Sequence, residues 1–199
     1  MLQMLRGITR RLGSIALNRP SPVQKQRAAL REAIRRRDAS EIKRLADSGM
    51  NLDFSYTWQF RPQGSPMAFA FLTGDRSISD ILIAHGASTS PKSPGNQTLL
   101  VNAVRGGNIE LVDLALSAGH DIHFKPQNYA KPLASAIHHQ SIAMARFLVS
   151  KGAGAEDVKL SDCRWYAMRS EMICFVSELG MEVPKDVLAC VEKGSWDGR

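Results

Sequence analysis

Histidine and cysteine are the residues of this 199-residue chain that could hold a metal ion or attack a substrate. The histidines are His85, His120, His123, His138 and His139. They contain no H-E-x-x-H pair of the kind that binds zinc in hydrolases, and the three cysteines form no C-x-x-C unit. The sequence also lacks a G-x-S-x-G turn, a glycine-rich phosphate loop and a dinucleotide fingerprint. We therefore expect a protein that is not an enzyme, with no cofactor, no metal site and no small-molecule substrate.

Positive charge is concentrated at one end of the chain. Residues 1–37 contain ten Lys or Arg and one acidic residue, Glu32, whereas the remainder contains 16 basic and 18 acidic residues. The composition, 44% hydrophobic and 23% charged, is that of a globular protein, and no apolar run approaches the roughly 18 residues of a membrane-spanning helix. Because three cysteines cannot all pair, we expect a reducing, cytoplasmic setting.

Glycine recurs along the chain with a nearly constant period. Gly49, Gly86, Gly119, Gly152 and Gly180 are separated by 37, 33, 33 and 28 residues, and each follows a short apolar helical pattern. Glycine is the usual residue just after a helix, where the backbone turns left-handed. A period of this length is typical of a solenoid of stacked repeats.

Each period is predicted to contain two helices. Ser65-Pro66, Thr98-Leu99 and Lys131-Pro132 begin apolar runs 21 residues before the terminal glycines, and proline favours the first turn of a helix. Gly74 and Gly107 lie twelve residues before those glycines, where the chain must turn between two helices. The unit is a helix, a tight turn, a second helix, a glycine and an extended loop.

The repeats carry short motifs that place them in a known class. The third reads Gly107-Asn108-Ile109-Glu110-Leu111-Val112 and closes with Gly119-His120-Asp121-Ile122-His123. In these motifs the chain resembles the ankyrin-repeat family, whose 33-residue unit opens with a T-P-L-H-like tetrapeptide and closes with G-A-D-V-N. The resemblance covers about residues 25–182, as four clear repeats and one degenerate repeat. The tetrapeptide histidine is missing from every repeat, so its hydrogen bonds between neighbours must be replaced or lost.

The resemblance implies an all-α helix-turn-helix solenoid with short hairpin loops and capping helices. We expect residues 1–24 to be a basic amphipathic segment and linker, residues 25–194 the repeat domain and residues 195–199 a tail. The pattern after Pro184 predicts a final capping helix. Residues 1–19 have an apolar face at helical spacing, which favours a membrane-surface anchor, an organelle presequence or a partner-docking helix. The alternatives are packing on the first repeat and disorder.

A basic groove is the first candidate binding surface. The positions just before the turns within the helix pairs are equivalent in successive repeats, so they should line one concave face. They include Arg35, Arg36, Arg105, His138 and His139. Such a face would attract a protein with an acidic surface. The alternative is that these residues are solvated helix ends.

The loop after the first repeat is the second candidate. It is four residues longer than the others and contains Phe54, Tyr56, Trp58 and Phe60 at strict alternation, followed by Arg61. Alternation predicts a strand-like arm with the four rings on one side. A side facing solvent would bind a partner, because Tyr, Trp and Arg are frequent in binding hot spots. A side facing inward would cover the neighbouring helices instead.

These observations favour a protein-binding module of the adaptor, scaffold, stoichiometric inhibitor or immunity type, which uses the concave groove and the hairpin arms. The alternative is a targeting protein that binds a membrane surface or nucleic acid through residues 1–19. The scaffold alone does not decide which partner is bound, because one fold serves many functions.

Overall fold

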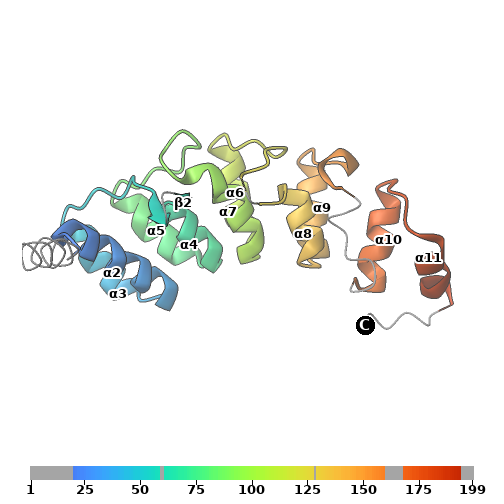
Figure 1. Ribbon diagram of the computed structural model, residues 1–199, viewed down its shortest axis with the longest axis horizontal. Helices are drawn as coiled ribbons and strands as arrows, with labels where there is room; N and C mark the ends of the chain where they lie inside the picture. The colour runs from blue at the N-terminus through green and yellow to red at the C-terminus, as the bar shows by residue number, and fades with distance from the viewer. Residues whose placement is uncertain (1–19, 59–60, 128, 160–167, 194–199) are drawn as a thin grey trace, which may run out of the picture.

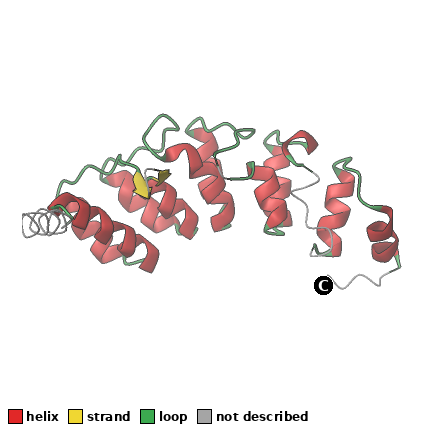
Figure 2. Cartoon of the chain, in the orientation of Figure 1, coloured by secondary structure: helices red, strands yellow, loops and turns green. Residues whose placement is uncertain are grey.

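The computed structural model describes residues 20–58, 61–127, 129–159 and 168–193. Pairs of helices follow one another along a gentle arch, with the long loops on its upper edge in the view of Figure 1. The short turns within each pair lie on the lower edge. Figure 2 shows helices throughout, apart from one small hairpin, so the predicted all-α solenoid is confirmed. Within the described residues, no helix is long and apolar enough to cross a membrane.

The elements repeat in the order that the glycine period predicts. The helices are α2 (Pro22–Arg36), α3 (Ala39–Asp47), α4 (Pro66–Thr73), α5 (Arg76–Ala84), α6 (Leu99–Gly106), α7 (Ile109–Ser117), α8 (Pro132–His138), α9 (Ile142–Ser150), α10 (Ser170–Glu178) and α11 (Lys185–Glu192). The remaining elements are strands β1 (Tyr56–Trp58) and β2 (Arg61–Gly64) and the 3₁₀ turns η1 (Asn96–Thr98) and η2 (Ala155–Asp157). The first helix of the degenerate fifth repeat would fall on residues 160–167, outside the described part.

Backbone conformation confirms where the helices were expected to end. The five periodic glycines all have positive φ, from 73° at Gly49 to 106° at Gly152. In the first four helix pairs the turn between the helices also contains a left-handed residue, and these residues are Arg37, Gly74, Gly107 and Gln140. The last helix, α11, follows Pro184 as predicted and buries Val187.

The first helix is longer than the repeat pattern suggests. Helix α2 has 15 residues, whereas α4 and α6 have eight each. Ser21 caps it by accepting from the backbone of Gln24, whose side chain accepts from the backbone nitrogen of Ser21. Helix α2 therefore begins at Pro22, three residues before residue 25, where the sequence predicts the start of the repeat domain. The seven extra residues add about two helical turns at the N-terminal end.

A continuous apolar core runs through the stacked pairs, from Leu30 in α2 to Val187 in α11. The first helix of each pair packs on the first helix of the next, in the order α2, α4, α6, α8. Helix α6 lies inside this row, and its residues 99–104 are all buried. The central repeats therefore have apolar positions on nearly every side of their first helix.

Two asparagine side chains form hydrogen bonds at the junction of the second and third repeats. The Asn96 side chain donates to the carbonyl oxygens of Ser88, at 2.7 Å, and Ser90, at 3.0 Å, and accepts from the hydroxyl of Ser65. Asn102 donates across to the carbonyl oxygen of Ala68, at 3.0 Å. Both amides are buried, so side-chain hydrogen bonds connect the second and third repeats although the tetrapeptide histidine is missing.

The extra residues of the first long loop form the hairpin. Strands β1 and β2 are antiparallel, with Thr57 opposite Pro62 and Trp58 opposite Arg61. A bulge between Tyr56 and Thr57 shifts the register at the base of the arm. The predicted strand-like arm is therefore present, and its base lies beside α2 and α4.

Candidate functional site: an arginine groove on the first two repeats

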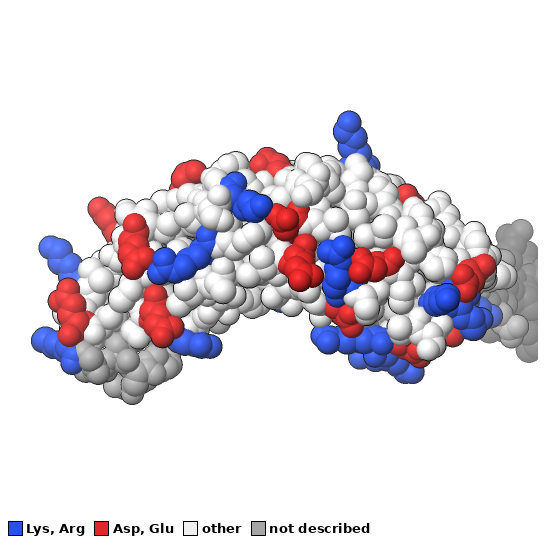
Figure 3. All heavy atoms as spheres, turned by 180° about the vertical axis from the view of Figure 1, so that it is seen from behind, with Lys and Arg blue, Asp and Glu red and all other residues white. Residues whose placement is uncertain are grey.

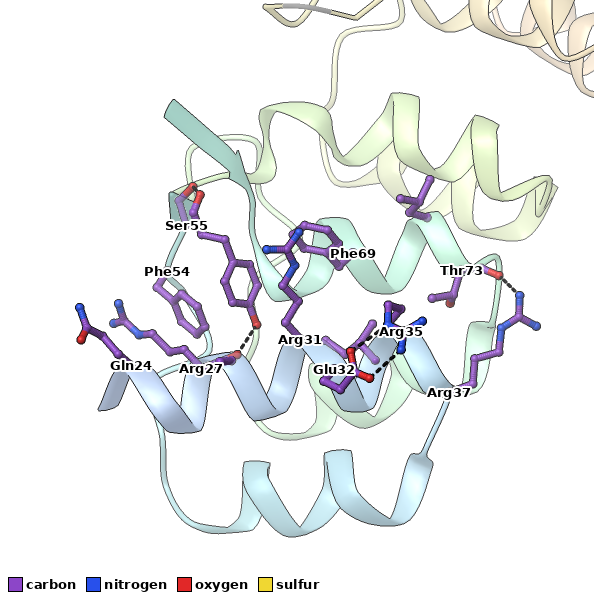
Figure 4. A pocket seen from close by; sticks show the side chains of 14 residues that line it. Gln24, Arg27, Arg31, Glu32, Arg35, Arg37, Phe54, Ser55, Phe69 and Thr73 are labelled. Carbon is purple, nitrogen blue, oxygen red and sulfur yellow. Dashed lines mark hydrogen bonds and ion pairs between the residues drawn. The ribbon is translucent and has the colours of Figure 1, made fainter. Parts of the chain in front are cut away.

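A groove of about 890 Å³ lies between α2, α4 and the base of the hairpin. Four arginines and three aromatic rings line it, together with one carboxylate. These residues, here called the arginine groove, are Arg27, Arg31, Arg35, Arg37, Phe54, Tyr56, Phe69 and Glu32. Figure 4 shows Arg27, Arg31 and Arg35 following one another along α2, with Phe69 facing them from α4. The groove is open to solvent and carries net positive charge.

The base of the aromatic arm forms one wall of the groove. Phe54 and Tyr56 are only 5% and 9% exposed, and the Tyr56 ring meets Phe54 and Phe69 edge to face. The hydroxyl of Tyr56 donates to the backbone oxygen of Arg27 at 3.0 Å. Burial raises the pKa of Tyr56, so the hydroxyl stays protonated. Of the two alternatives left open by the sequence, the inward one is therefore correct for these two rings.

The tip of the arm is less fully described. The backbones of Trp58 and Arg61 face each other in the hairpin, and the placement of their side chains is not described. Phe60 lies outside the described residues. Their role in binding stays a prediction.

Two arginines of α2 lie over aromatic rings of this wall. The guanidinium carbon of Arg27 is 4.1 Å from the centre of the Phe54 ring. That of Arg31 is 4.8 Å from the centre of the Phe69 ring. Stacking fixes a guanidinium group by cation–π attraction and leaves the N–H groups at its edge available to a ligand.

The two arginines that the sequence selected on this helix are already paired. Arg35 and Arg36 both donate to the Glu32 carboxylate, at distances of 2.6 to 2.8 Å. The hydrogen bond from Arg35 lowers the pKa of Glu32 to about 2, although that group is also partly desolvated. This end of the groove is therefore less basic than the sequence predicted.

A second basic cluster lies further along the row. The exposed rings of His138 and His139 meet edge to face, with centres 5.3 Å apart. Burial lowers the pKa of His139, and the nearby His138 and Arg105 lower it further. The structure thus brings together three of the predicted groove residues. His139 therefore gains its positive charge at a lower pH than an ordinary histidine does.

The sequence did not reveal the centre of the groove, Arg27 and Arg31. The apolar runs of the other repeats begin 21 residues before their terminal glycine, and the equivalent position in the first repeat is Ala28. The Ser21-Pro22-x-Gln24 capping box was the available signal for an earlier start. With that start, the four-residue spacing of Arg27, Arg31 and Arg35 places them on one face of the helix.

Within the described residues, one group of side chains has the composition of a metal site. His123, Glu156 and Asp157 bring potential ligand atoms within 4.8 Å of one another. The Asp157 carboxylate is fully buried and already accepts from Lys131 Nζ at 2.9 Å and pairs with His123 Nδ1 at 2.8 Å. The Lys131 ammonium supplies the positive charge that a metal ion would bring to Asp157, so this group is a poor metal site. Its ion pairs join the fourth repeat to its neighbour instead.

The face of the solenoid opposite to that of Figure 1 carries charges of both signs. Basic and acidic side chains are interspersed over it, as Figure 3 shows. Ion pairs join neighbouring repeats elsewhere in the solenoid, such as Lys151 with Asp113 at 2.6 Å and Arg146 with Glu178 at 3.2 Å. Such exposed pairs contribute little to stability individually.

Comparison with known proteins shows which solved structures and sequences this chain is similar to. No protein-family model matches the sequence. The chain is similar to the crystal structure of the human ASB11 ankyrin repeat domain, with a TM-score of 0.60 over 78% of this chain and 70% of that one, at 18% identity. It is 26% identical over 131 residues to an ankyrin repeat and KH domain-containing protein of Caenorhabditis briggsae. This chain has the fold of an ankyrin repeat domain.

A second curated relative agrees with this assignment. It is the ankyrin repeat, SAM and basic leucine zipper domain-containing protein 1 of Oryctolagus cuniculus, 27% identical over 137 residues. The matches cover 63% and 64% of this chain but only 5% and 27% of the two relatives. The chain therefore corresponds to a small part of those proteins. Ankyrin repeats generally act as protein-interaction modules without catalytic activity.

Proposed function

We propose that this protein binds an acidic segment of a partner protein in the arginine groove. The observation that supports this most strongly is the pair Arg27 and Arg31, stacked on Phe54 and Phe69 in an open groove. Guanidinium groups held beside aromatic rings provide both charge recognition and contact area, the combination found in binding hot spots. Acidic segments would also be steered to this end of the solenoid by its local positive charge.

A longer acidic segment would continue along the row of first helices. Thr73 lies between the two basic clusters, and its backbone oxygen accepts from Arg37 at 2.8 Å. Helices α4, α6 and α8 then lead to Arg105 and the His138-His139 pair. We therefore include this second cluster in the proposed binding surface.

Binding of this kind would make the protein an adaptor, a scaffold or a stoichiometric inhibitor. A cytoplasmic setting remains part of the proposal, because three cysteines cannot all pair with one another. Residues 1–19 lie outside the described part of the chain, so membrane or nucleic-acid association through them stays an alternative prediction.

The test compares capture of partners by three full-length forms: the wild type, Arg31→Gln and Lys43→Gln. Lys43 is an exposed cation on α3 outside the arginine groove, so it controls for charge loss. We expect Arg31→Gln to weaken capture of a specific partner about tenfold, since charge-assisted hydrogen bonds are lost, and to reduce the salt dependence of association. Lys43→Gln should behave as wild type. Equal capture by all three folded forms would contradict the proposal.

A further inference from the structure

We infer that the partner segment carries a phosphorylated side chain and that Arg27 and Arg31 form its phosphate-binding seat. This inference rests on the proposed function and specifies its ligand. It follows from three features of the groove. Within the described part of the chain, Arg27 and Arg31 form no ion pair, whereas Arg35 does. Aromatic rings contact the first two, and Glu32 already occupies the third.

The seat consists of two guanidinium groups one helical turn apart. A spacing of four residues corresponds to a rise of about 6 Å along α2, so an anion placed between the two groups can accept hydrogen bonds from both. Within the described residues, neither Arg27 nor Arg31 forms an ion pair with an acidic side chain. A phosphate monoester has three terminal oxygens, enough to accept from both planar forks at once, whereas a carboxylate has two.

The aromatic wall holds this seat in position before a ligand arrives. Arg27 is half-buried against Phe54, and its backbone oxygen accepts from Tyr56. Arg31 lies 4.8 Å from the centre of the Phe69 ring and 5.6 Å from that of Tyr56. Because stacking restricts these long side chains, less conformational entropy is lost when they bind an anion.

Glu32 makes the groove selective for a ligand with more charge than a carboxylate. Its carboxylate accepts from Arg35 at 2.6 and 2.8 Å and from Arg36 at 2.6 Å, so it acts as an internal acidic ligand. A partner carboxylate offers Arg35 nothing that Glu32 does not already provide. A phosphorylated side chain carries about −1.5 to −2 charges at neutral pH and gains more from Arg27 and Arg31.

A small-molecule titration of the full chain tests the seat directly. The probes are phenyl phosphate and phenylacetate, an aromatic phosphate and an aromatic carboxylate. Binding is followed by NMR of the arginine Nε–Hε signals. We expect the Arg27 and Arg31 signals to move, with phenyl phosphate bound at least about tenfold more tightly than phenylacetate.

Three variants assign the preference to individual residues. Arg31→Gln should weaken phenyl phosphate binding at least about tenfold, while the control Lys43→Gln leaves it unchanged. Glu32→Gln should release Arg35 and Arg36, strengthen phenylacetate binding and narrow the difference between the two probes. Equal binding of both probes by the wild type, or an unaltered preference in Glu32→Gln, would overturn the inference.

Peptide pools then separate this inference from the proposed function. Matched acidic pools containing phosphorylated Ser, Thr or Tyr, or their unphosphorylated forms, are passed over the immobilised full chain. Retention of the phosphorylated pools, lost in Arg31→Gln, supports the inference. Equal retention of unphosphorylated pools through Arg31 refutes it and leaves the proposed function standing. Retention of no pool by the folded protein counts against both.

A membrane source of phosphate is tested in the same experiment. Phosphatidylcholine vesicles with and without a phosphorylated phosphatidylinositol are offered to the wild type and to Arg31→Gln. Retention of phosphoinositide vesicles through Arg31, with no peptide pool retained, overturns the inference in favour of a lipid headgroup.

Discussion

Gly74 and Gly106 bring the backbones of two neighbouring repeats into direct contact. A Cβ atom on Gly74 would overlap the carbonyl oxygen of Gly106 and lie 3.1 Å from its carbonyl carbon. Both contacts are with backbone atoms, which cannot swing aside like the end of a side chain. Helices α4 and α6 can therefore approach this closely only with glycine at their ends.

This contact predicts unequal effects for two similar substitutions. Gly74 and Gly107 have φ of 69° and 75° at equivalent turns, but nothing lies within 4 Å of a Cβ on Gly107. Gly107→Ala should cost about 1 kcal/mol of unfolding free energy from left-handed strain alone. Gly74→Ala should cost about 1–3 kcal/mol more, because the repeats must separate. Urea denaturation measures both, and equal losses would show that the close approach is unimportant.

The buried hydrogen bonds around Asn96 give a second prediction. Asn96 is 1% exposed and links Ser65, at the start of one repeat, to the carbonyls of Ser88 and Ser90. Asn96→Ala leaves these carbonyl oxygens without their donor, so we expect a loss of about 2–4 kcal/mol of unfolding free energy. Ser65→Ala should cost about 1 kcal/mol through loss of a helix cap. A double-mutant cycle should show coupling of about 1 kcal/mol, whereas strict additivity would mean that the two side chains act independently.

His85 gives the clearest pH-dependent prediction. Its Nδ1 lies 2.7 Å from the carbonyl oxygen of Ile81 and its Nε2 lies 2.8 Å from Asp47 of the preceding repeat. Only the protonated ring can donate to both, and these acceptors raise the pKa of His85. The stabilisation is therefore complete below the unfolded-state pKa, about 6.5, and is lost as pH rises through the higher folded-state value.

The measurement compares the wild type with His85→Gln, because other histidines titrate as well. Asp157 raises the pKa of His123, while burial lowers that of His120. These shifts remain in both proteins, so the difference between them isolates His85. The wild type should be the more stable form at pH 5.5, and its advantage should shrink by pH 8.5. An advantage that is constant or grows with pH would contradict the assigned charge state.

The sequence predicted the repeats well because their signals are local. A glycine with positive φ ends each unit, and Pro66 and Pro132 begin helices, so each boundary can be recognised without its neighbours. The turn residues Arg37 and Gln140 could also have been found, by counting one repeat interval from Gly74 and Gly107. Period and backbone geometry therefore sufficed for most of the fold.

The binding groove was harder to predict because it depends on contacts between distant segments. Alternation placed Phe54 and Tyr56 on one side of an arm, but only the added turns of α2 decide that this side faces inward. Likewise, the sequence does not distinguish Arg35 from Arg31. In the fold Arg35 pairs with Glu32, whereas Arg31 lies over the ring of Phe69. Charge alone could not reveal which guanidinium groups remain available.

Tyr56 gives the last prediction, which separates a structural role from a contact with a partner. Its ring is buried between Phe54 and Phe69, and its hydroxyl donates to the Arg27 backbone. Tyr56→Ala should lower the unfolding free energy by about 3–5 kcal/mol, because it leaves a cavity behind the groove. Tyr56→Phe removes only the hydrogen bond and should cost about 1 kcal/mol.

Chemical denaturation and binding measured on the same samples test this assignment. Tyr56→Phe should keep near-wild-type affinity for any ligand of the arginine groove, since the Tyr56 ring still supports Arg31 and Phe69. Tyr56→Ala should lose both affinity and stability. A loss of affinity in this variant would therefore not show that Tyr56 contacts the partner directly. A Tyr56→Phe protein that stays folded but no longer binds would show that the hydroxyl itself meets the partner, contrary to its burial here.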